Sequence, residues 1–292
     1  MNQSPPVILT IAGSDSGGGA GIQADIKAIS ATGGYACSAI TALTAQNTCG
    51  VEAVSPVDPA FVRAQLNAVL YDMPVRAVKI GMLANQAIIR EVAAVLARSP
   101  HLPVVLDPVM IATSGDPLLD DDAMDALINT LIPRTTILTP NLPEAARLTG
   151  CPVPTTTEEM YALVPALRKL GCPYVMLKGG HLHHAPESLD VWISRDTCQT
   201  LSARRIETPN THGTGCSLSA AIASFYAQGL TPIDAGRAAK RYLTDALAHS
   251  QQLTVGRGAG RYIIFSPTPL MRVFIYPSMR WLNRTLSLNN AL

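Results

Sequence analysis

The sequence predicts an α/β fold with a mostly parallel central sheet. Short runs rich in β-branched residues alternate with longer stretches rich in alanine and leucine, as expected for strands joined by crossover helices. The short runs are apolar throughout, which is typical of strands that are covered on both faces. Most of them end in a polar or glycine-rich segment. Because the carboxyl ends of parallel strands lie along one edge of a sheet, these segments are expected to line one cleft.

The expected elements follow one another along most of the chain. Buried strands are predicted at residues 7–12, 39–45, 77–81, 104–107, 136–139 and 175–178. Helical patterns, several of which begin near an Asp or Thr that can cap a helix, are found at residues 20–32, 59–70, 86–98, 120–131 and 157–170. A hairpin is predicted at residues 189–193 and 200–206, and it is followed by helices at residues 214–228 and 232–249.

Composition predicts one large globular domain. Of the 292 residues, 48% are hydrophobic and 15% are charged, so a sizeable core can form. The net charge of +1 and the lack of a long basic run argue against a nucleic-acid partner. Without a run of about 18 apolar residues, no membrane partner is expected. We predict one domain at residues 1–260 and an atypical tail at residues 261–292, which has four arginines and no acidic residue.

The six cysteines indicate a reducing compartment. They are scattered, with no CxxC pair and no dense disulfide spacing, so free thiols are expected. The N-terminus has neither the positive patch nor the apolar segment of a secretory signal. A cytoplasmic location is therefore predicted.

Two glycine clusters follow predicted strands. Residues 13–21 fit neither the Walker pattern nor GxGxxG, so this loop either lets a flat substrate approach the backbone or packs a strand tightly on a helix. Residues 211–216 precede a helix, where backbone amides and the helix dipole bind anions, although a plain glycine-rich cap is the alternative. Lys178, Asp107 and Glu144 at neighbouring strand ends favour the anion site, because they supply a cation for phosphates and acids for Mg²⁺.

Seven segments occur in order over residues 7–260, namely AGSDSGGGAGIQADIK, TALTAQNTCGV, VKIGML, VVLDPVMIATSGD, TPNLPEA, LKGGH and NTHGTGCSLSAAIAS. Together they resemble the hydroxymethylpyrimidine/phosphomethylpyrimidine kinases of thiamine biosynthesis. The resemblance implies a ribokinase-like three-layer α/β/α fold with a mostly parallel central sheet. It also implies that ATP and Mg²⁺ are used to phosphorylate a small-molecule pyrimidine, 4-amino-5-hydroxymethyl-2-methylpyrimidine, and then its monophosphate in one site. A homodimer is a further expectation.

The resemblance assigns residues of this chain to four roles. The pyrimidine pocket would be lined by Gly13, Asp25, Gln46, Met82 and Val109, with the Gln46 amide on the aminopyrimidine edge and Met82 on a ring face. ATP would be bound by Lys178, Asn141 and Thr211, and Mg²⁺ would be held by Asp107 and Glu144. The anion hole and the catalytic thiol would be formed by Gly213, Thr214, Gly215 and Cys216.

The residues alone leave plainer alternatives open. Asp25 lies in a helical pattern and could be a solvated acid, Gln46 could cap a strand end, and Met82 could fill the core. Lys178 could be an exposed strand-end lysine, and Asp107 could be a turn acid.

A histidine tract also needs an interpretation. The tract consists of His181, His183 and His184 and resembles a metal site, but no carboxylate or thiolate completes the set. We therefore interpret these histidines as loop residues.

Cys216 stands where many kinases of this fold class carry an aspartate that can act as a catalytic base. A helix N-terminus lowers the pKa of a thiol, so Cys216 could accept the hydroxyl proton as a thiolate. A buried, inert cysteine is the alternative. Since a neutral thiol would not repel a phosphate monoester, replacement by Asp is expected to harm the second phosphorylation more than the first.

The sequence was also compared with the features expected for three other functions. A pyridoxine/pyridoxal kinase would use the same phosphate machinery, but Gln46 and Cys216 favour the pyrimidine. A catalytically silent pyrimidine-binding protein is suggested only by the unusual tail. A dinucleotide oxidoreductase is disfavoured because the glycine fingerprint is wrong.

Overall fold

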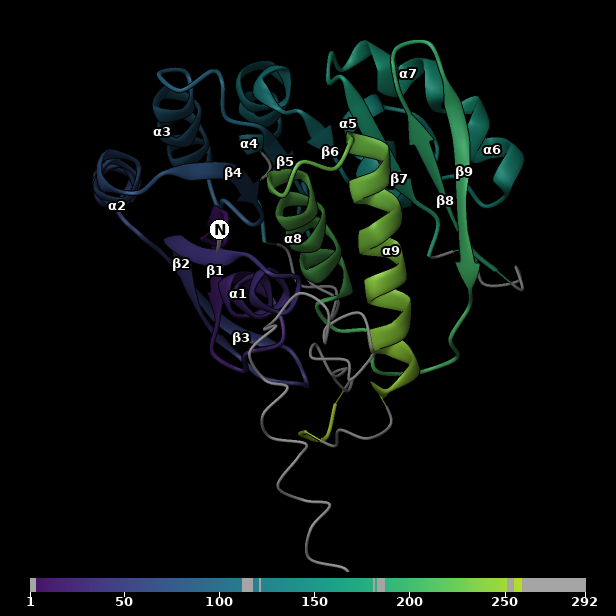
Figure 1. The fold of residues 1–292 in the computed structure, drawn as a ribbon, viewed down its shortest axis with the longest axis horizontal. Helices are drawn as coiled ribbons and strands as arrows, with labels where there is room; N and C mark the ends of the chain where they lie inside the picture. Colours follow the sequence, from purple (N-terminus) through teal and green to yellow (C-terminus); the bar gives the residue numbers. More distant parts are fainter. Residues whose placement is uncertain are drawn as a thin grey trace, which may run out of the picture.

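A nine-stranded sheet forms the middle layer of the computed structural model, which describes residues 4–111, 118–120, 122–180, 182, 187–250 and 255–258. The strand order is β3-β2-β1-β4-β5-β6-β7-β8-β9, and helices cover both faces (Figure 1). This three-layer arrangement confirms the predicted fold class.

The central strands are parallel and the edges are antiparallel. The parallel strands, in spatial order, are β2 (Tyr35–Gln46), β1 (Val7–Asp15), β4 (Val75–Ile80), β5 (Val104–Leu106), β6 (Ile137–Leu138) and β7 (Tyr174–Lys178). Antiparallel strands complete the two edges, namely β3 (Val51–Pro56), β8 (Glu187–Ile193) and β9 (Cys198–Arg204). The carboxyl ends of the parallel strands therefore meet along one edge, as predicted.

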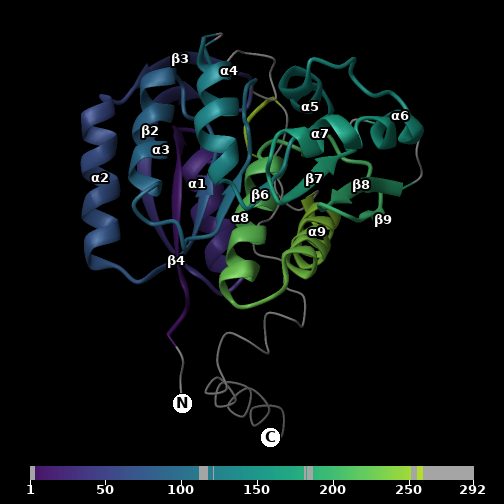
Figure 2. The same ribbon diagram turned by 90° about the horizontal axis from the view of Figure 1, so that it is seen from above.

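Each face of the sheet has its own helices and its own core. One face is covered by α1 (Gly21–Ala31), α8 (Thr214–Ala227) and α9 (Pro232–Ala248) (Figure 2). The other carries α2 (Pro59–Asp72), α3 (Gln86–Leu96), α4 (Ala123–Ala126), α5 (Leu142–Thr149), α6 (Thr157–Ala162) and α7 (Val164–Lys169). In β1, Leu9 and Ile11 join one core while Ile8 joins the other, which explains why this strand is apolar throughout.

A glycine lets α9 lie close to the sheet. Gly236 faces the buried Trp192 of β8, and a Cβ on this glycine would lie 2.7 Å from the Trp192 ring. Since real Cβ atoms do not approach other atoms so closely, a larger residue would push α9 away from the sheet. This contact sets the position of Lys240, one turn further along α9.

Some predicted elements differ from the observed ones. Strand β3 and helix α5 were not predicted, because β3 is a mostly exposed edge strand and α5 follows directly on a polar strand end. The helix predicted at residues 120–131 consists of α4 and a π-helical turn at Leu127–Leu131. The helix predicted at residues 157–170 is divided between α6 and α7, where Pro165 cannot continue the helical hydrogen bonds.

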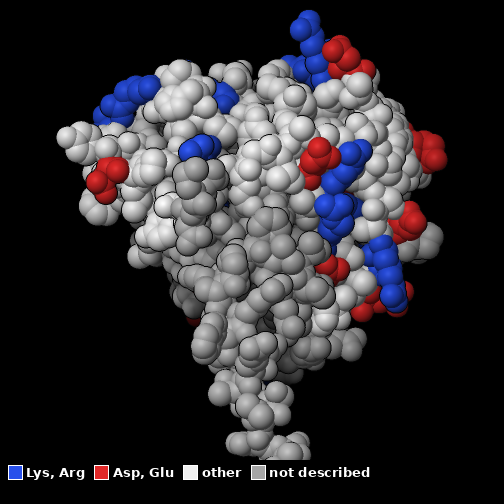
Figure 3. All heavy atoms as spheres, viewed as in Figure 1, with Lys and Arg blue, Asp and Glu red and all other residues white. Residues whose placement is uncertain are grey.

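Two predictions lie outside the described residues, namely the tail at 261–292 and the histidine tract. In the part of the chain that the structure describes, no helix combines the length and apolarity that a membrane crossing requires. On the face shown in Figure 3, basic and acidic side chains of the described residues are interspersed, in line with the net charge of +1.

Candidate functional site

A cavity of about 780 Å³ lies at the carboxyl ends of the parallel strands. It brings together nearly all the residues that were assigned a role from the sequence. Those that line it are Gly13, Gln46, Met82, Asp107, Val109, Asn141, Glu144, Lys178, Thr211, Gly213, Thr214, Gly215 and Cys216.

The expectation that Asp25 lines the pocket is wrong. Its side chain has no exposed surface and is not part of the cavity wall. Asp25 lies on the inner stripe of α1, where Lys79 of β4 donates to its Oδ2 at 2.8 Å and Thr10 of β1 donates to the same oxygen at 2.6 Å. A carboxylate on the buried face of a helix needs such partners, and they turn it away from the cavity.

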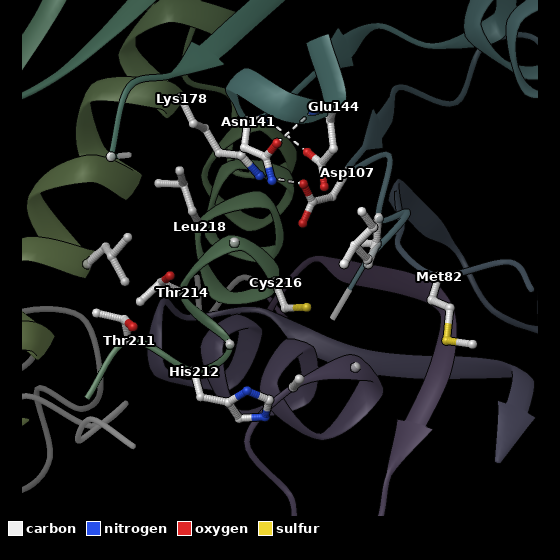
Figure 4. Close-up of a pocket in the computed structure, with 18 of the residues that line it drawn as sticks. Met82, Asp107, Asn141, Glu144, Lys178, Thr211, His212, Thr214, Cys216 and Leu218 are labelled. Atoms are coloured by element: carbon white, nitrogen blue, oxygen red, sulfur yellow. Dashed lines mark hydrogen bonds and ion pairs between the residues drawn. The ribbon is translucent and has the colours of Figure 1, made fainter. Parts of the chain in front are cut away.

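A lysine and an aspartate form the polar centre of the cavity. Lys178 Nζ, at the end of β7, donates to Oδ1 of Asp107 at 2.7 Å, and Thr139 donates to the same oxygen at 3.2 Å (Figure 4). Burial alone would lower the pKa of Lys178, but Asp107 and Glu144 outweigh burial and raise it. The lysine is therefore a fixed positive charge at neutral pH.

Glu144 is held by a capping box at the start of α5. Its Oε2 accepts from the amide of Asn141 at 2.7 Å, and its own amide donates to Oδ1 of Asn141 at 2.8 Å. Burial raises the pKa of Glu144 to about 7, while Lys178 opposes this shift and Asp107 adds to it. A cation arriving here would favour the charged form of this carboxyl.

These two acids suit Mg²⁺ that is bound mainly by water and phosphate. Among the described residues, no cluster of three or more His, Cys, Asp or Glu side chains could hold a metal ion. Within the same residues, Oδ2 of Asp107 and Oε1 of Glu144 accept no hydrogen bond. Because Mg²⁺ usually keeps several waters and takes one or two carboxylates, two such oxygens fit it.

The second glycine cluster begins helix α8. Gly213 is the N-cap in a left-handed conformation, and the amide of Thr214 donates to the carbonyl of Thr211 at 3.3 Å. The amides of Gly215 and Cys216 have no acceptor in the described part of the chain. A Cβ on Gly215 would lie 3.3 Å from both Asp107 Oδ2 and Lys178 Nζ, so this backbone closely approaches the polar centre. The arrangement can bind an anion next to a cation.

Of the two interpretations of Cys216, burial favours the neutral thiol over the thiolate. Burial raises the pKa of this thiol to about 11; Lys79 opposes the shift, and Asp25 and Asp107 add to it. The helix N-terminus and the Gly21 amide, which donates to the sulfur, do not offset the loss of water. Cys216 is therefore a neutral thiol near pH 7.

One end of the cavity suits a flat ring with hydrogen-bonding edges. Met82 is pinned by Thr41, whose hydroxyl donates to the Met82 carbonyl at 2.6 Å. Gly13 faces it, and a Cβ there would lie 2.9 Å from Met82 Sδ. Thr44 donates to Oε1 of Gln46 at 3.1 Å, which leaves the Gln46 Nε2 group to donate to a ligand. Gly13 thus lets the Met82 side chain lie directly against the first glycine loop.

The other end of the cavity lies across α8 and is lined by apolar side chains together with charged ones such as Arg205 and Lys240. In Figure 4, Met82 and Leu218 lie on opposite sides of Cys216. Leu218 lines the cavity together with Ile206, Leu243 and Leu247, which come from the end of β9 and from α9. The polar centre therefore lies between two compartments that can each hold a planar group.

Sequence reasoning missed two side-chain pairs in the cavity wall. His212 Nε2 lies 3.3 Å from Oδ2 of Asp15, and Lys240 Nζ lies 2.6 Å from Oδ2 of Asp190. Asp15 and His212 both stood inside quoted motifs, so their position next to the glycines was the available signal. Lys240 and Asp190 carried no motif and meet only because α9 packs on β8.

Comparison with known proteins gives consistent matches over most of the chain. The model of the phosphomethylpyrimidine kinase family matches residues 15–262. The hydroxymethylpyrimidine/phosphomethylpyrimidine kinase of Salmonella typhimurium is 50% identical over 252 residues, which cover 86% of this chain and 94% of the relative. The protein of the same name from Rhizobium meliloti is also 50% identical, over 87% of this chain and 95% of the relative.

Solved structures show the same architecture. The ADP complex of Bacillus subtilis pyridoxal kinase superposes with a TM-score of 0.82 at 34% identity, covering 90% of this chain and 98% of that one. Phosphomethylpyrimidine kinase from Clostridium difficile superposes with a TM-score of 0.73 at 41% identity, covering 83% of this chain and 99% of that one.

Proposed function

This chain belongs to the phosphomethylpyrimidine kinase family, and we propose that its cavity transfers a phosphoryl group from ATP to hydroxymethylpyrimidine and then to its monophosphate. It is a kinase of thiamine biosynthesis. One observation carries the residue roles: Lys178, Asp107 and the amides at the start of α8 lie between two compartments of a single cavity. Such a cavity suits two planar substrates that meet at a phosphate.

The compartment at Met82 is assigned to the pyrimidine. The Gln46 Nε2 group would donate to a ring nitrogen, because Thr44 already occupies Oε1. Gly13 leaves room for the ring beside Met82, and Val109 adds apolar surface. The hydroxymethyl group would then extend toward Cys216 and the polar centre.

The compartment at Leu218 is assigned to the nucleotide. Thr211 and Asn141 would contact it, Lys178 would balance the charge of its terminal phosphates, and the amides of Gly215 and Cys216 would receive the phosphoryl oxygens. Donors fixed in advance stabilise the charge of the transition state without reorganising. Mg²⁺, held by Asp107 and Glu144 with water, would neutralise further phosphate charge.

In the first step the substrate hydroxyl oxygen bonds to the terminal phosphorus, the bond from that phosphorus to the ADP oxygen breaks, and the hydroxyl proton passes to an oxygen of the transferred phosphoryl group. Phosphoryl transfer has a loose transition state, so positioning counts for more than a strong base. In the second step the nucleophile is a phosphate oxygen that is already ionised near neutral pH. A neutral Cys216 suits both steps, because it neither repels the monophosphate nor has to remove a proton from it.

The direct test is a mass-resolved product assay. The protein is incubated with ATP, Mg²⁺ and hydroxymethylpyrimidine, and we expect the monophosphate first and the diphosphate later. Omitting ATP is the blank, and an exchange of Lys178 for Met is the matched site variant. If the wild-type protein formed neither product, the proposal would be refuted.

A second activity, phosphorylation of pyridoxal, deserves the same assay. It is favoured by the structural likeness to Bacillus subtilis pyridoxal kinase. The same phosphate machinery would act on this flat heteroaromatic alcohol. Side-by-side turnover of both alcohols measures the preference, and we expect kcat/KM to be higher for the pyrimidine.

We also propose a homodimer. Apolar side chains are exposed near the β3 edge of the sheet, including Leu43, Val54 and Phe61, and closed symmetric pairs are the commonest assembly of soluble chains. Light scattering coupled to size exclusion should give about twice the chain mass. A monomer at micromolar concentration would contradict this proposal.

We also propose that the protein is located in the cytoplasm. All six cysteines are free thiols, which suits a reducing compartment. Fractionation of cells that express a tagged copy tests it, and recovery outside the cytoplasm would overturn it.

A further inference from the structure

Two buried side chains link loops that are far apart in sequence. His212 directly precedes Gly213, and Asp15 ends β1, 197 positions earlier. Their side chains are 10% and 2% exposed, and His212 Nε2 lies 3.3 Å from Asp15 Oδ2. Burial opposes the ionisation of Asp15, but His212 and the amides of Ala20, Gly19 and Gly17 outweigh it and lower its pKa to about 2. Because a carboxylate only accepts, His212 Nε2 is the donor.

Asp15 also shapes the first glycine loop. Its Oδ1 accepts from the amide of Gly17, and its Oδ2 accepts from the amides of Gly19 and Ala20, all at 2.8 Å. The loop in turn holds Gln46, because Ser16 Oγ donates to the Gln46 carbonyl at 2.7 Å and accepts from the Gln46 amide at 2.8 Å. One carboxylate thus organises the loop that holds the backbone of Gln46, the proposed pyrimidine contact.

The first glycine loop and the segment that begins α8 also touch each other directly, through the backbones of Gly19 and Gly213. Gly213 has a φ of +83°, and a Cβ on it would lie 1.8 Å from the carbonyl oxygen of Gly19. Because the two backbones lie so close together, no side chain at position 213 would fit between them. The position of the α8 amides relative to the first loop therefore depends on how His212 and Asp15 hold the backbones on each side.

We propose that His212 is a positioning residue for phosphoryl transfer. By donating to Asp15, it keeps the amides of Gly215 and Cys216 at a fixed separation from the first glycine loop, whose Ser16 holds the backbone of Gln46 at the end of β2. His212 touches no reacting atom, so its effect belongs on kcat and not on the binding of either substrate. This inference rests on the proposed kinase function and adds to it a residue to which no role had been given.

The test compares His212→Ala with His212→Gln, whose amide can still donate to Asp15. The control is His101→Ala, which changes an exposed histidine outside the cavity. For His212→Ala we expect kcat to fall by about 10- to 100-fold, with both KM values within about threefold of wild type. The Gln variant should recover most of kcat, and the control should match wild type.

A readout that does not need activity completes the experiment. Hydrogen exchange of the free protein should be faster in His212→Ala at residues 17–20 and 214–217, and close to wild type in His212→Gln. In an Asp15→Asn background, His212→Ala should cause no further loss of kcat. Wild-type kcat in His212→Ala, or equal losses in the Ala and Gln variants, would overturn the inference. If wild type phosphorylates neither alcohol, the kinase proposal fails, and the exchange rates alone then decide for or against the link.

Discussion

Lys178 Nζ lies 2.7 Å from Oδ1 of Asp107, although the two residues are 71 positions apart and stand at the ends of different strands. The pair leaves Oδ2 of Asp107 without a hydrogen bond in the described part of the chain, next to the backbone of Gly215. The positive charge of Lys178 is thus fixed next to the anion site, and Oδ2 of Asp107 stays available to a cation.

Loss of the lysine should mainly slow the chemical step. We expect Lys178→Met to lower kcat by about 10²- to 10³-fold, because the positive charge that stabilises the transferred phosphoryl group is gone. Steady-state kinetics with both pyrimidine substrates measure this, and Lys169→Met on the exposed end of α7 is the control. An unchanged kcat would remove Lys178 from the mechanism.

A methyl group at Gly13 should narrow the pyrimidine compartment. Its Cβ would lie 2.9 Å from Met82 Sδ, so Met82 must shift into the space assigned to the ring. We expect Gly13→Ala to raise KM for hydroxymethylpyrimidine by about tenfold and to leave KM for ATP unchanged. The double variant Gly13→Ala/Met82→Ala should recover part of the loss, and a rise in KM for ATP alone would count against this assignment.

The neutral thiol makes a prediction about the two steps. Cys216→Asp should lower the rate of the second phosphorylation more than that of the first, since a carboxylate repels the monophosphate nucleophile. Cys216→Ser keeps a neutral group and should affect both steps alike. Single-turnover measurements with each substrate provide the ratio. Equal losses in both steps for the Asp variant would show that charge at this position is unimportant.

Asp15 should make stability depend on pH in the acid range. Its folded pKa of about 2 lies below the ordinary value of 3.8, so folding favours the charged form. This contribution, about 2 kcal/mol, is complete above about pH 4 and is lost as pH falls through about 2. Urea unfolding from about pH 5 to about pH 2 should therefore show a steeper loss for wild type than for Asp15→Asn. Asp58→Asn, which changes an exposed cap of α2, should follow wild type.

Lys240 should matter for stability because its partner is buried. Its Nζ lies 2.6 Å from Oδ2 of Asp190, whose Oδ1 accepts from the amide of Gly179 at 3.0 Å. Lys240→Met leaves that carboxylate uncompensated and should lower the free energy of unfolding by about 3–5 kcal/mol. Adding Asp190→Asn should restore much of it. If the double variant were as unstable as the single one, lost packing and not charge would be responsible.

Much of the fold was predictable, because buried parallel strands and amphipathic helices each have a characteristic pattern of apolar residues in the sequence. The strands at 7–12 and 175–178 and the helices at 214–228 and 232–249 are confirmed within a few residues. Strand β3 was missed because five of its six residues are exposed and give no apolar run. Its place at the edge depends on pairing with β2, which is a tertiary contact.

The candidate site was predictable where motifs end strands, and less so where charge and burial decide. Lys178 and Asp107 stood at strand ends and do meet. Asp25 was assigned only by the resemblance and lies in a helical pattern; it faces Lys79 inside the protein, because the phase of α1 turns it inward. The sequence also left the state of the Cys216 thiol open, because the helix terminus is visible in the sequence, whereas the loss of water around the sulfur is a property of the folded cavity.

The position of β1 affects how the protein must be made. This strand is synthesised before the other strands of the sheet, yet it lies in the interior between β2 and β4, and its Asp15 pairs with a histidine 197 residues further along the chain. Contacts over such separations form slowly during folding. The anion site at the start of α8 is thus a late product of translation, and a nascent chain that stops before α8 lacks the amides of Gly215 and Cys216 as well as Leu218.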